Sequence, residues 1–309
     1  MEAFAIPFLL FVGALLAVQA AANVQLSTAT GSPVGASTLQ LGIGASLLLA
    51  AALVAGSLDA LGGHDRAEPW HLIGGLGSAV YITSGILLFP RLGAVLTVGL
   101  WITGQMLASL LLDGFGWLGV DAEPLGPPEL MGGIAVLIGA ALIVRAQGER
   151  GAPDGSLRER GGWLALGVLA GAALPIQGAI NAGLRSELDA TIAVGAVSFV
   201  VATAGMGLLL AVSLAVAHAP PPRLEPLRWM PWWGWLGGIA GALYVTAVFS
   251  LIPEIGAAPT IALTIGGQQA ASVLVDRFGL LRLPRRPISP LRLVAVGALL
   301  TGVLLIQVA

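Results

Sequence analysis

The sequence predicts an all-α membrane protein with ten transmembrane helices, arranged as two five-helix repeats of inverted topology. Three observations lead to this prediction: a very apolar composition, one segment that recurs 163 positions later, and Arg residues confined almost entirely to alternate loops. Of the 309 residues, 57% are hydrophobic and 10% are charged, and the mean hydropathy is +0.93. A soluble domain has roughly 45–50% apolar and about 25% charged residues, so the composition excludes an ordinary soluble fold.

The same composition excludes several functional classes. A net charge of −2 argues against binding to nucleic acid, and the absence of Cys rules out disulfides, thiolate chemistry and Cys-ligated metals. The first apolar stretch has no basic residue before it, only Glu2, which is not the pattern of a cleaved signal peptide. We therefore expect this stretch to be a retained helix.

Ten segments have the length and apolarity of membrane-spanning helices. Each contributes about 20 residues, the number needed to cross about 30 Å of hydrocarbon. The expected helices are 4–26, 33–57, 70–90, 93–113, 128–147, 161–184, 189–217, 231–251, 257–276 and 290–308. A polar, charged stretch interrupts this series, so we predict a first repeat at 1–147, a cytoplasmic linker at 148–160 and a second repeat at 161–309.

The repetition is visible in three segments. Residues 104–116, GQMLASLLLDGFG, and 267–279, GQQAASVLVDRFG, share Gly, Gln, Ala, Ser, Asp, Phe and Gly at the same spacing. Residues 13–26 align with 171–184 at an offset of 158, and 74–93 align with 237–256 at an offset of 163. Because polar residues are matched at nearly constant offsets, the pattern indicates an internal duplication.

The orientation follows from the odd number of helices in each repeat, which makes the second copy enter the membrane from the opposite side. Short cytoplasmic loops collect Arg. Loops on the side of the amino terminus carry Arg66 and Arg185 alone, and those on the other side carry Arg91, Arg145, Arg150, Arg158, Arg160, Arg223, Arg228, Arg277, Arg282, Arg285, Arg286 and Arg292. We therefore expect both termini outside the cytoplasm.

These motifs resemble a known family. Q-x-x-x-N in the first helix, Y-x-T before a Pro-Gly turn, and G-Q-x-x-A-S-x-x-x-D-x-F-G are similar to the YdcZ-like branch of the drug/metabolite transporter superfamily. Members of that branch resemble one half of this chain, so the resemblance implies a fused two-copy form. It further implies a secondary transporter in a bacterial plasma (inner) membrane, which moves a small molecule by alternating access. The alternative is a non-transporting scaffold or lipid-handling protein, in which polar residues only join helices.

Polar residues within the helices are the candidate substrate ligands, because unpaired polar groups in lipid are costly and face the bundle interior. Inverted-repeat transporters hold substrate near mid-depth between the repeats. The candidates are Gln19, Asn23, Tyr81, Trp101, Gln105, Gln177, Asn181, Tyr244 and Gln268. Gln105 and Gln268 either bind a small polar ligand or hydrogen-bond between helices, a bond worth about 0.6–2 kcal/mol. For the Gln/Asn pairs, the tyrosines and Trp101, packing is the favoured interpretation.

Two further residues concern ion coupling. Asp113 and Asp276 come last in their helices, so we expect solvated side chains at the membrane interface; drawn inward, either becomes a candidate for proton coupling. The three His residues are scattered in or beside loops, and no Ser-His-Asp order or phosphate loop occurs. We therefore expect neither enzymatic activity nor a cofactor. The sequence leaves open whether two copies associate.

Overall fold

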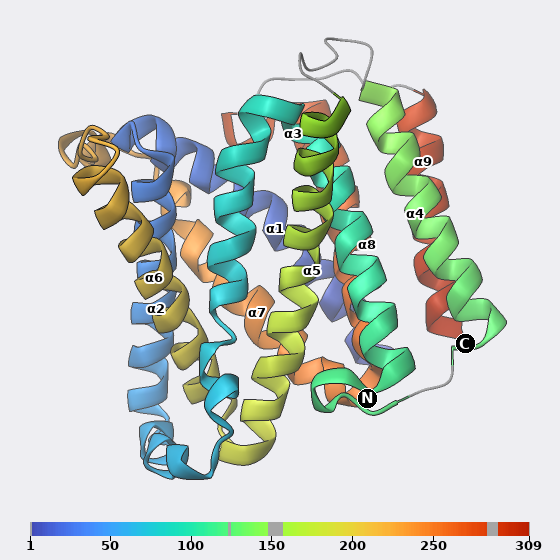
Figure 1. Cartoon of the computed structure of the whole chain (residues 1–309), viewed down its shortest axis with the longest axis horizontal. Helices are drawn as coiled ribbons and strands as arrows, with labels where there is room; N and C mark the ends of the chain where they lie inside the picture. The colour runs from blue at the N-terminus through green and yellow to red at the C-terminus, as the bar shows by residue number, and fades with distance from the viewer. Residues whose placement is uncertain (1, 123–124, 148–156, 283–289, 309) are drawn as a thin grey trace.

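The computed structural model describes residues 2–122, 125–147, 157–282 and 290–308, although some side chains within these ranges lie outside the description. The described residues form helices joined by turns, with no strand among them (Figure 1). The α-helices are α1 (Glu2–Thr30), α2 (Pro33–Val54), α3 (Leu76–Phe115), α4 (Pro127–Gln147), α5 (Leu157–Leu188), α6 (Thr191–Ala215), α7 (Leu236–Ile255), α8 (Ala257–Phe278) and α9 (Pro290–Val308). Short 3-10 turns cover Ser57–Arg66, Pro69–Ile73, Trp117–Gly119, Glu225–Trp229, Trp232–Trp235 and Leu280–Arg282.

Seven stretches of the described chain are long and apolar enough to cross a membrane, which makes this a multi-pass membrane protein. They are Phe4–Thr30, Pro33–Val54, Pro69–Leu88, Leu96–Phe115, Gly161–Leu188, Thr191–Ala215 and Trp232–Ile255. Two apolar stretches are shorter, Pro127–Leu142 in α4 and Leu293–Ile306 in α9. Each of the ten predicted segments coincides with a helix, and within the described residues length and hydropathy support seven of them as spans.

The predicted break between 70–90 and 93–113 does not occur. α3 runs through both segments, and its ribbon turns over at the upper edge of Figure 1. A proline inside a helix removes one hydrogen bond and bends the axis, but the helix need not end there. The corresponding place in the second half differs, because Gly256 adopts a φ of 86° and separates α7 from α8.

Helices from before and after the linker pack against one another in pairs. The most extensively packed pairs are α3 with α5, α4 with α9, α2 with α6, and α1 with α8. In Figure 1, α2 and α6 lie at one side of the bundle, α4 and α9 lie at the other, and the remaining helices fill the space between. The two halves of the chain are therefore interleaved rather than set apart.

Glycines allow two of these pairs to approach with backbone against backbone. A methyl group added at Gly104 in α3 would overlap the carbonyl of Val168 in α5, and one added at Gly267 in α8 would overlap the carbonyl of Leu10 in α1. Small residues at such crossings let helices pack closely without a hydrophobic driving force. Since Gly267 is 163 positions after Gly104 and Val168 is 158 after Leu10, the α1–α8 crossing repeats the α3–α5 crossing.

The two D-x-F-G motifs also fold alike. Gly116 and Gly279 both adopt the left-handed conformation, with φ of 63°, and end α3 and α8 respectively. Each is followed by a short 3-10 turn containing a leucine at positive φ, Leu118 in one case and Leu281 in the other. Glycine takes this conformation without the steric cost that a Cβ brings, so the repeated Gly serves as a helix stop in both halves.

Candidate substrate-binding site

An aromatic pair lies in the interior of the first half. The rings of Tyr81 and Trp101 pack with centroids 4.1 Å apart at 36°, and the Trp101 indole N–H donates to Ser84 Oγ at 3.0 Å. Ser84 in turn donates to the Tyr81 carbonyl at 2.7 Å. Trp101 is buried, as expected for a core residue, but its indole also has a polar partner. The pair joins the two limbs of α3 and forms one wall of the bundle interior.

The matching position in the second half holds Tyr244 and Thr264. Tyr244 is buried, and its hydroxyl makes no hydrogen bond of regular geometry within the described chain, although Thr264 lies beside it. The Thr264 hydroxyl donates to the Ile261 carbonyl at 2.9 Å. Tyr81 and Tyr244 are close enough to interact electrostatically. The structure therefore brings both predicted tyrosines into one central region, with an indole on one side of it only.

The predicted amide pair Gln105 and Gln268 is not placed alike. Gln105 is 3% exposed, whereas Gln268 is half-buried. The buried glutamine of α8 is instead the neighbouring residue, Gln269. Gln105 therefore places an amide in the buried interior of the bundle. Gln269 was not among the sequence candidates, because the repeat pairs it with Met106 and therefore gives no polar match.

Gln177 and Asn181 have protein partners, in agreement with the packing interpretation. Asn181 Nδ2 donates to Ser198 Oγ at 2.9 Å, and Gln177 Nε2 approaches the same oxygen at 3.4 Å. Ser78 Oγ donates to Gln177 Oε1 at 2.8 Å. All four side chains are buried. This network ties α5 to α3 and α6, so these amides act first as connectors between helices.

Gln19 and Asn23 occupy the matching positions in the first half but lack this network. Gln19 is half-buried beside Gly241, and the buried Asn23 Oδ1 has no hydrogen-bond partner in the described chain. The buried oxygens Ser37 Oγ and Gln40 Oε1 on α2 are likewise unpaired there. A buried acceptor without a partner carries a desolvation cost of about 1–3 kcal/mol, so this half has polar atoms available for a ligand or water.

Asp113 corrects a prediction. Its side chain is 4% exposed rather than solvated, and it accepts the backbone N–H of Ala257 at 2.7 Å and that of Ala258 at 2.5 Å. The first N–H groups of a helix lack partners within the helix, and a carboxylate there also suits the helix dipole. Asp113 at the end of α3 therefore caps the start of α8. The side chain of Asp276, the other candidate for coupling, lies outside the described residues.

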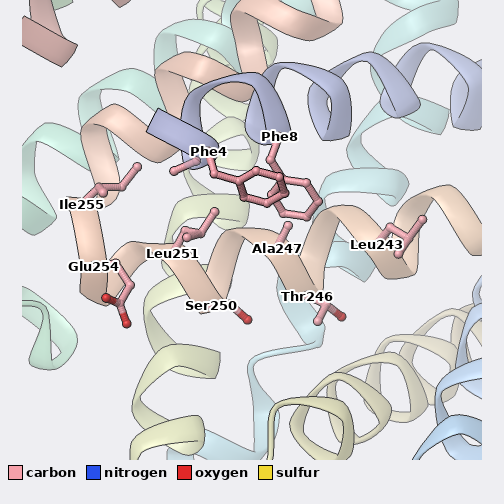
Figure 2. A pocket seen from close by; sticks show the side chains of 10 residues that line it. Phe4, Phe8, Leu243, Thr246, Ala247, Ser250, Leu251, Glu254 and Ile255 are labelled. Atoms are coloured by element: carbon pink, nitrogen blue, oxygen red, sulfur yellow. The ribbon is translucent and has the colours of Figure 1, made fainter. Parts of the chain in front are cut away.

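A cavity of about 1010 Å³ opens between the start of α1 and the second half of α7 (Figure 2). Phe4 and Phe8 line it from α1, and their rings stack with centroids 5.8 Å apart at 15°. The rest of the lining comes from α1 and α7: Ala5, Leu243, Thr246, Ala247, Ser250, Leu251, Glu254 and Ile255. We refer to this cavity as the α1–α7 groove.

None of the predicted ligand residues lines the α1–α7 groove. Ser250 and Thr246 lie one and two helical turns before Glu254, so one stripe of α7 along the groove carries three polar residues. The repeat signalled Thr246, which aligns with Thr83, but Ser250 aligns with Leu87 and Glu254 with Arg91. A search for matched polar residues therefore missed two of the three.

The comparisons with known proteins agree with this architecture. A family model described as "Putative inner membrane exporter, YdcZ" matches residues 4–142 and again 162–305. A solved crystal structure, whose description names no function, is similar over 98% of this chain and 95% of its own, with a TM-score of 0.64 and 18% identity, and so supports the fold. No curated protein is significantly similar. Because the family model covers nearly the whole chain in two successive matches, the protein belongs to the YdcZ family of inner-membrane exporters within the drug/metabolite transporter superfamily, in a two-copy form.

Proposed function

We propose that this protein exports a small molecule by alternating access between two halves of inverted topology. The observation that carries the proposal is the repeated backbone crossing, α1 on α8 and α5 on α3, with glycines at equivalent positions. Asp113 adds support, because it joins the end of α3 to the start of α8 and so links the two repeated segments. A fold with two equivalent arrangements of the same contacts can exchange between them at low energetic cost.

The orientation proposed from the Arg distribution places the termini and the α1–α7 groove on the outer side. On the other side, Arg91 occupies the position that matches Glu254. Its guanidinium lies 4.4 Å from the centre of the Trp163 ring, and Trp163 matches Ala5, which lines the groove. The open groove on one side and the covered equivalent on the other support assignment of the structure to an outward-open state.

Within this proposal, the substrate passes the central region that contains Tyr81, Trp101, Gln105 and Tyr244. Gln105 supplies hydrogen bonds there, and the aromatic rings supply apolar contact. Gln177 and Asn181 mainly hold helices together, because Ser78 and Ser198 already satisfy them. This division of roles favours transport over a purely structural protein, in which the amides would all be paired.

Alternating access can be tested without a known substrate, because the protein has no native Cys and introduced cysteines can be labelled one at a time. Single cysteines at Leu87 and Ser250, which occupy matching positions, report access from the two sides through labelling by an impermeant maleimide. Arg91→Gln should increase cytoplasmic labelling at position 87 and decrease external labelling at position 250. Arg228→Gln is the matched control, since this exposed Arg also lies near a Trp ring, 5.1 Å away. Labelling that changes in the same direction at both positions would contradict alternating access.

Substrate contact is tested with compounds selected by their ability to raise the Tm of the purified protein. Their uptake into proteoliposomes should be lost in Gln105→Leu combined with Gln268→Leu, while the Tm without ligand stays close to that of the unsubstituted protein. Unchanged uptake would exclude these amides from the substrate path. A lowered Tm with normal uptake per folded molecule would assign them to helix packing.

A further inference from the structure

The α1–α7 groove carries a net negative charge. Glu254 is exposed at one end of the groove, and it has no ion-pair partner within the described residues. Among the described residues, Arg185 is a basic side chain that contacts this part of α7. Its Nη1 donates to the Ser250 carbonyl at 3.0 Å, and its Nε donates to Thr191 Oγ1 at 3.2 Å. Arg185 is therefore engaged with the backbone of α7 rather than with the carboxylate.

The groove is amphipathic along its length. From Leu243 to Glu254, α7 advances about 17 Å at about 1.5 Å per residue, which is roughly half the hydrocarbon thickness of a bilayer. The wall opposite is formed by Phe4 and Phe8, and Phe4 is 73% exposed. One end thus presents a carboxylate and the remainder presents aromatic and aliphatic surface. The volume is enough for a ligand of drug size.

Two hydroxyl groups of α7 point away from Phe4 and Phe8 (Figure 2). Thr246 Oγ1 and Ser250 Oγ are buried, and neither has a hydrogen-bond partner in the described chain. Both belong to the α7 stripe that ends at Glu254. These hydroxyl oxygens are therefore enclosed by the bundle, and the surface that the groove presents to a ligand is mainly apolar.

We propose that the α1–α7 groove binds an amphipathic organic cation, with the positive charge beside Glu254 and the apolar body between Phe4, Phe8 and α7. This proposal rests on the transport function and names the substrate class. An exposed carboxylate at the end of an apolar groove, with no ion-pair partner among the described residues, attracts a cation and repels an anion of the same shape. The aromatic faces favour a cation as well. On the opposite side of the membrane, the residue that matches Glu254 is Arg91, whose guanidinium lies over the Trp163 ring. A cation of the chain itself therefore already occupies the equivalent place.

The test uses the purified full-length protein in nanodiscs of phosphatidylcholine, with tetraphenylphosphonium and tetraphenylborate as probes of similar size and opposite charge. Equilibrium binding of tetraphenylphosphonium should be saturable and should weaken at least tenfold in Glu254→Gln, which corresponds to about 1.4 kcal/mol. Glu225→Gln is the control: it removes one exposed carboxylate, 2.6 Å from Arg228, and should leave binding unchanged. Because Glu254 is exposed and has no ion-pair partner in the described part of the chain, its substitution should not impair folding, which a Tm measurement verifies.

Two results would overturn the proposal. One is equal affinity of the unsubstituted protein for both probes, as expected of a groove that merely holds lipid acyl chains. The other is tetraphenylphosphonium affinity that Glu254→Gln leaves unchanged. A second variant, Phe8→Leu, should lower the affinity several-fold through loss of the aromatic face. If binding fails while Arg91→Gln still exchanges the accessibility of positions 87 and 250, the substrate class is wrong and the transport mechanism stands.

Discussion

Substitution of Asp113 tests whether this buried acid serves as the cap at the start of α8. Asp113→Ala removes two hydrogen bonds, of 2.7 and 2.5 Å, from the backbone N–H groups of Ala257 and Ala258. A hydrogen bond to a charged group contributes about 1.5–3 kcal/mol, and the loss of an N-terminal helix cap costs about 0.5–2 kcal/mol. Because the site is buried, the cost lies toward the upper end, and we expect the free energy of unfolding to fall by about 2–4 kcal/mol.

The milder variant Asp113→Asn keeps one acceptor oxygen and should lower stability by about half as much. Unfolding in mixed micelles, followed by Trp fluorescence, measures both variants. Asp121→Asn, an exposed acid in the loop after α3, is the control and should have no effect beyond about 0.5 kcal/mol. The reasoning would be refuted if Asp113→Asn retained full stability while transport became independent of the proton gradient. That outcome would make Asp113 a coupling residue and not a cap.

Three further predictions concern packing and topology. Gly104→Ala should destabilise the protein by about 1–3 kcal/mol through overlap with the Val168 carbonyl, whereas Gly207→Ala, with open space around it, should be neutral or slightly stabilising in the same unfolding assay. Ser198→Ala should cost about 1–3 kcal/mol, because the amide N–H groups of Gln177 and Asn181 lose this acceptor, yet it should preserve transport of any compound found by uptake assay. Lost transport at normal stability would contradict this assignment. Single cysteines at Ala122 and within 148–160 should label from opposite faces of the membrane, and labelling of both from outside intact cells would disprove the inverted orientation.

Much of the fold could be predicted from the sequence, because helix formation in a bilayer depends on local properties. In lipid, each backbone polar group must find its partner within its own segment, so a long apolar run is helical almost regardless of its neighbours. The D-x-F-G motif belongs to the same class of prediction: the left-handed Gly116 and Gly279 end their helices through a conformation that favours Gly. The continuous path of α3 was not predictable in this way, because a proline within a helix is compatible with either a break or a bend.

The partners of the polar side chains were the part that the sequence could not determine. Matched spacing singled out Gln177, Asn181 and Asp113, but whether each faces solvent, substrate or another helix depends on segments many positions away in the chain. Asp113 meets Ala257 across 144 positions, and Gln177 meets Ser78 across 99. No local pattern encodes such a contact.

Composition and internal repetition by themselves determined that this chain is helical, membrane-embedded and duplicated, because hydropathy and Gly or Pro positions act over a few residues at a time. Tertiary structure decided which polar groups form hydrogen bonds between helices and which remain available to a ligand or water. It also revealed that Glu254 and Arg91, at equivalent positions with opposite charge, lie beside an open groove and a covered ring respectively. Charge and burial at such positions are set by the helix that packs opposite, and that neighbour is chosen only when the chain folds.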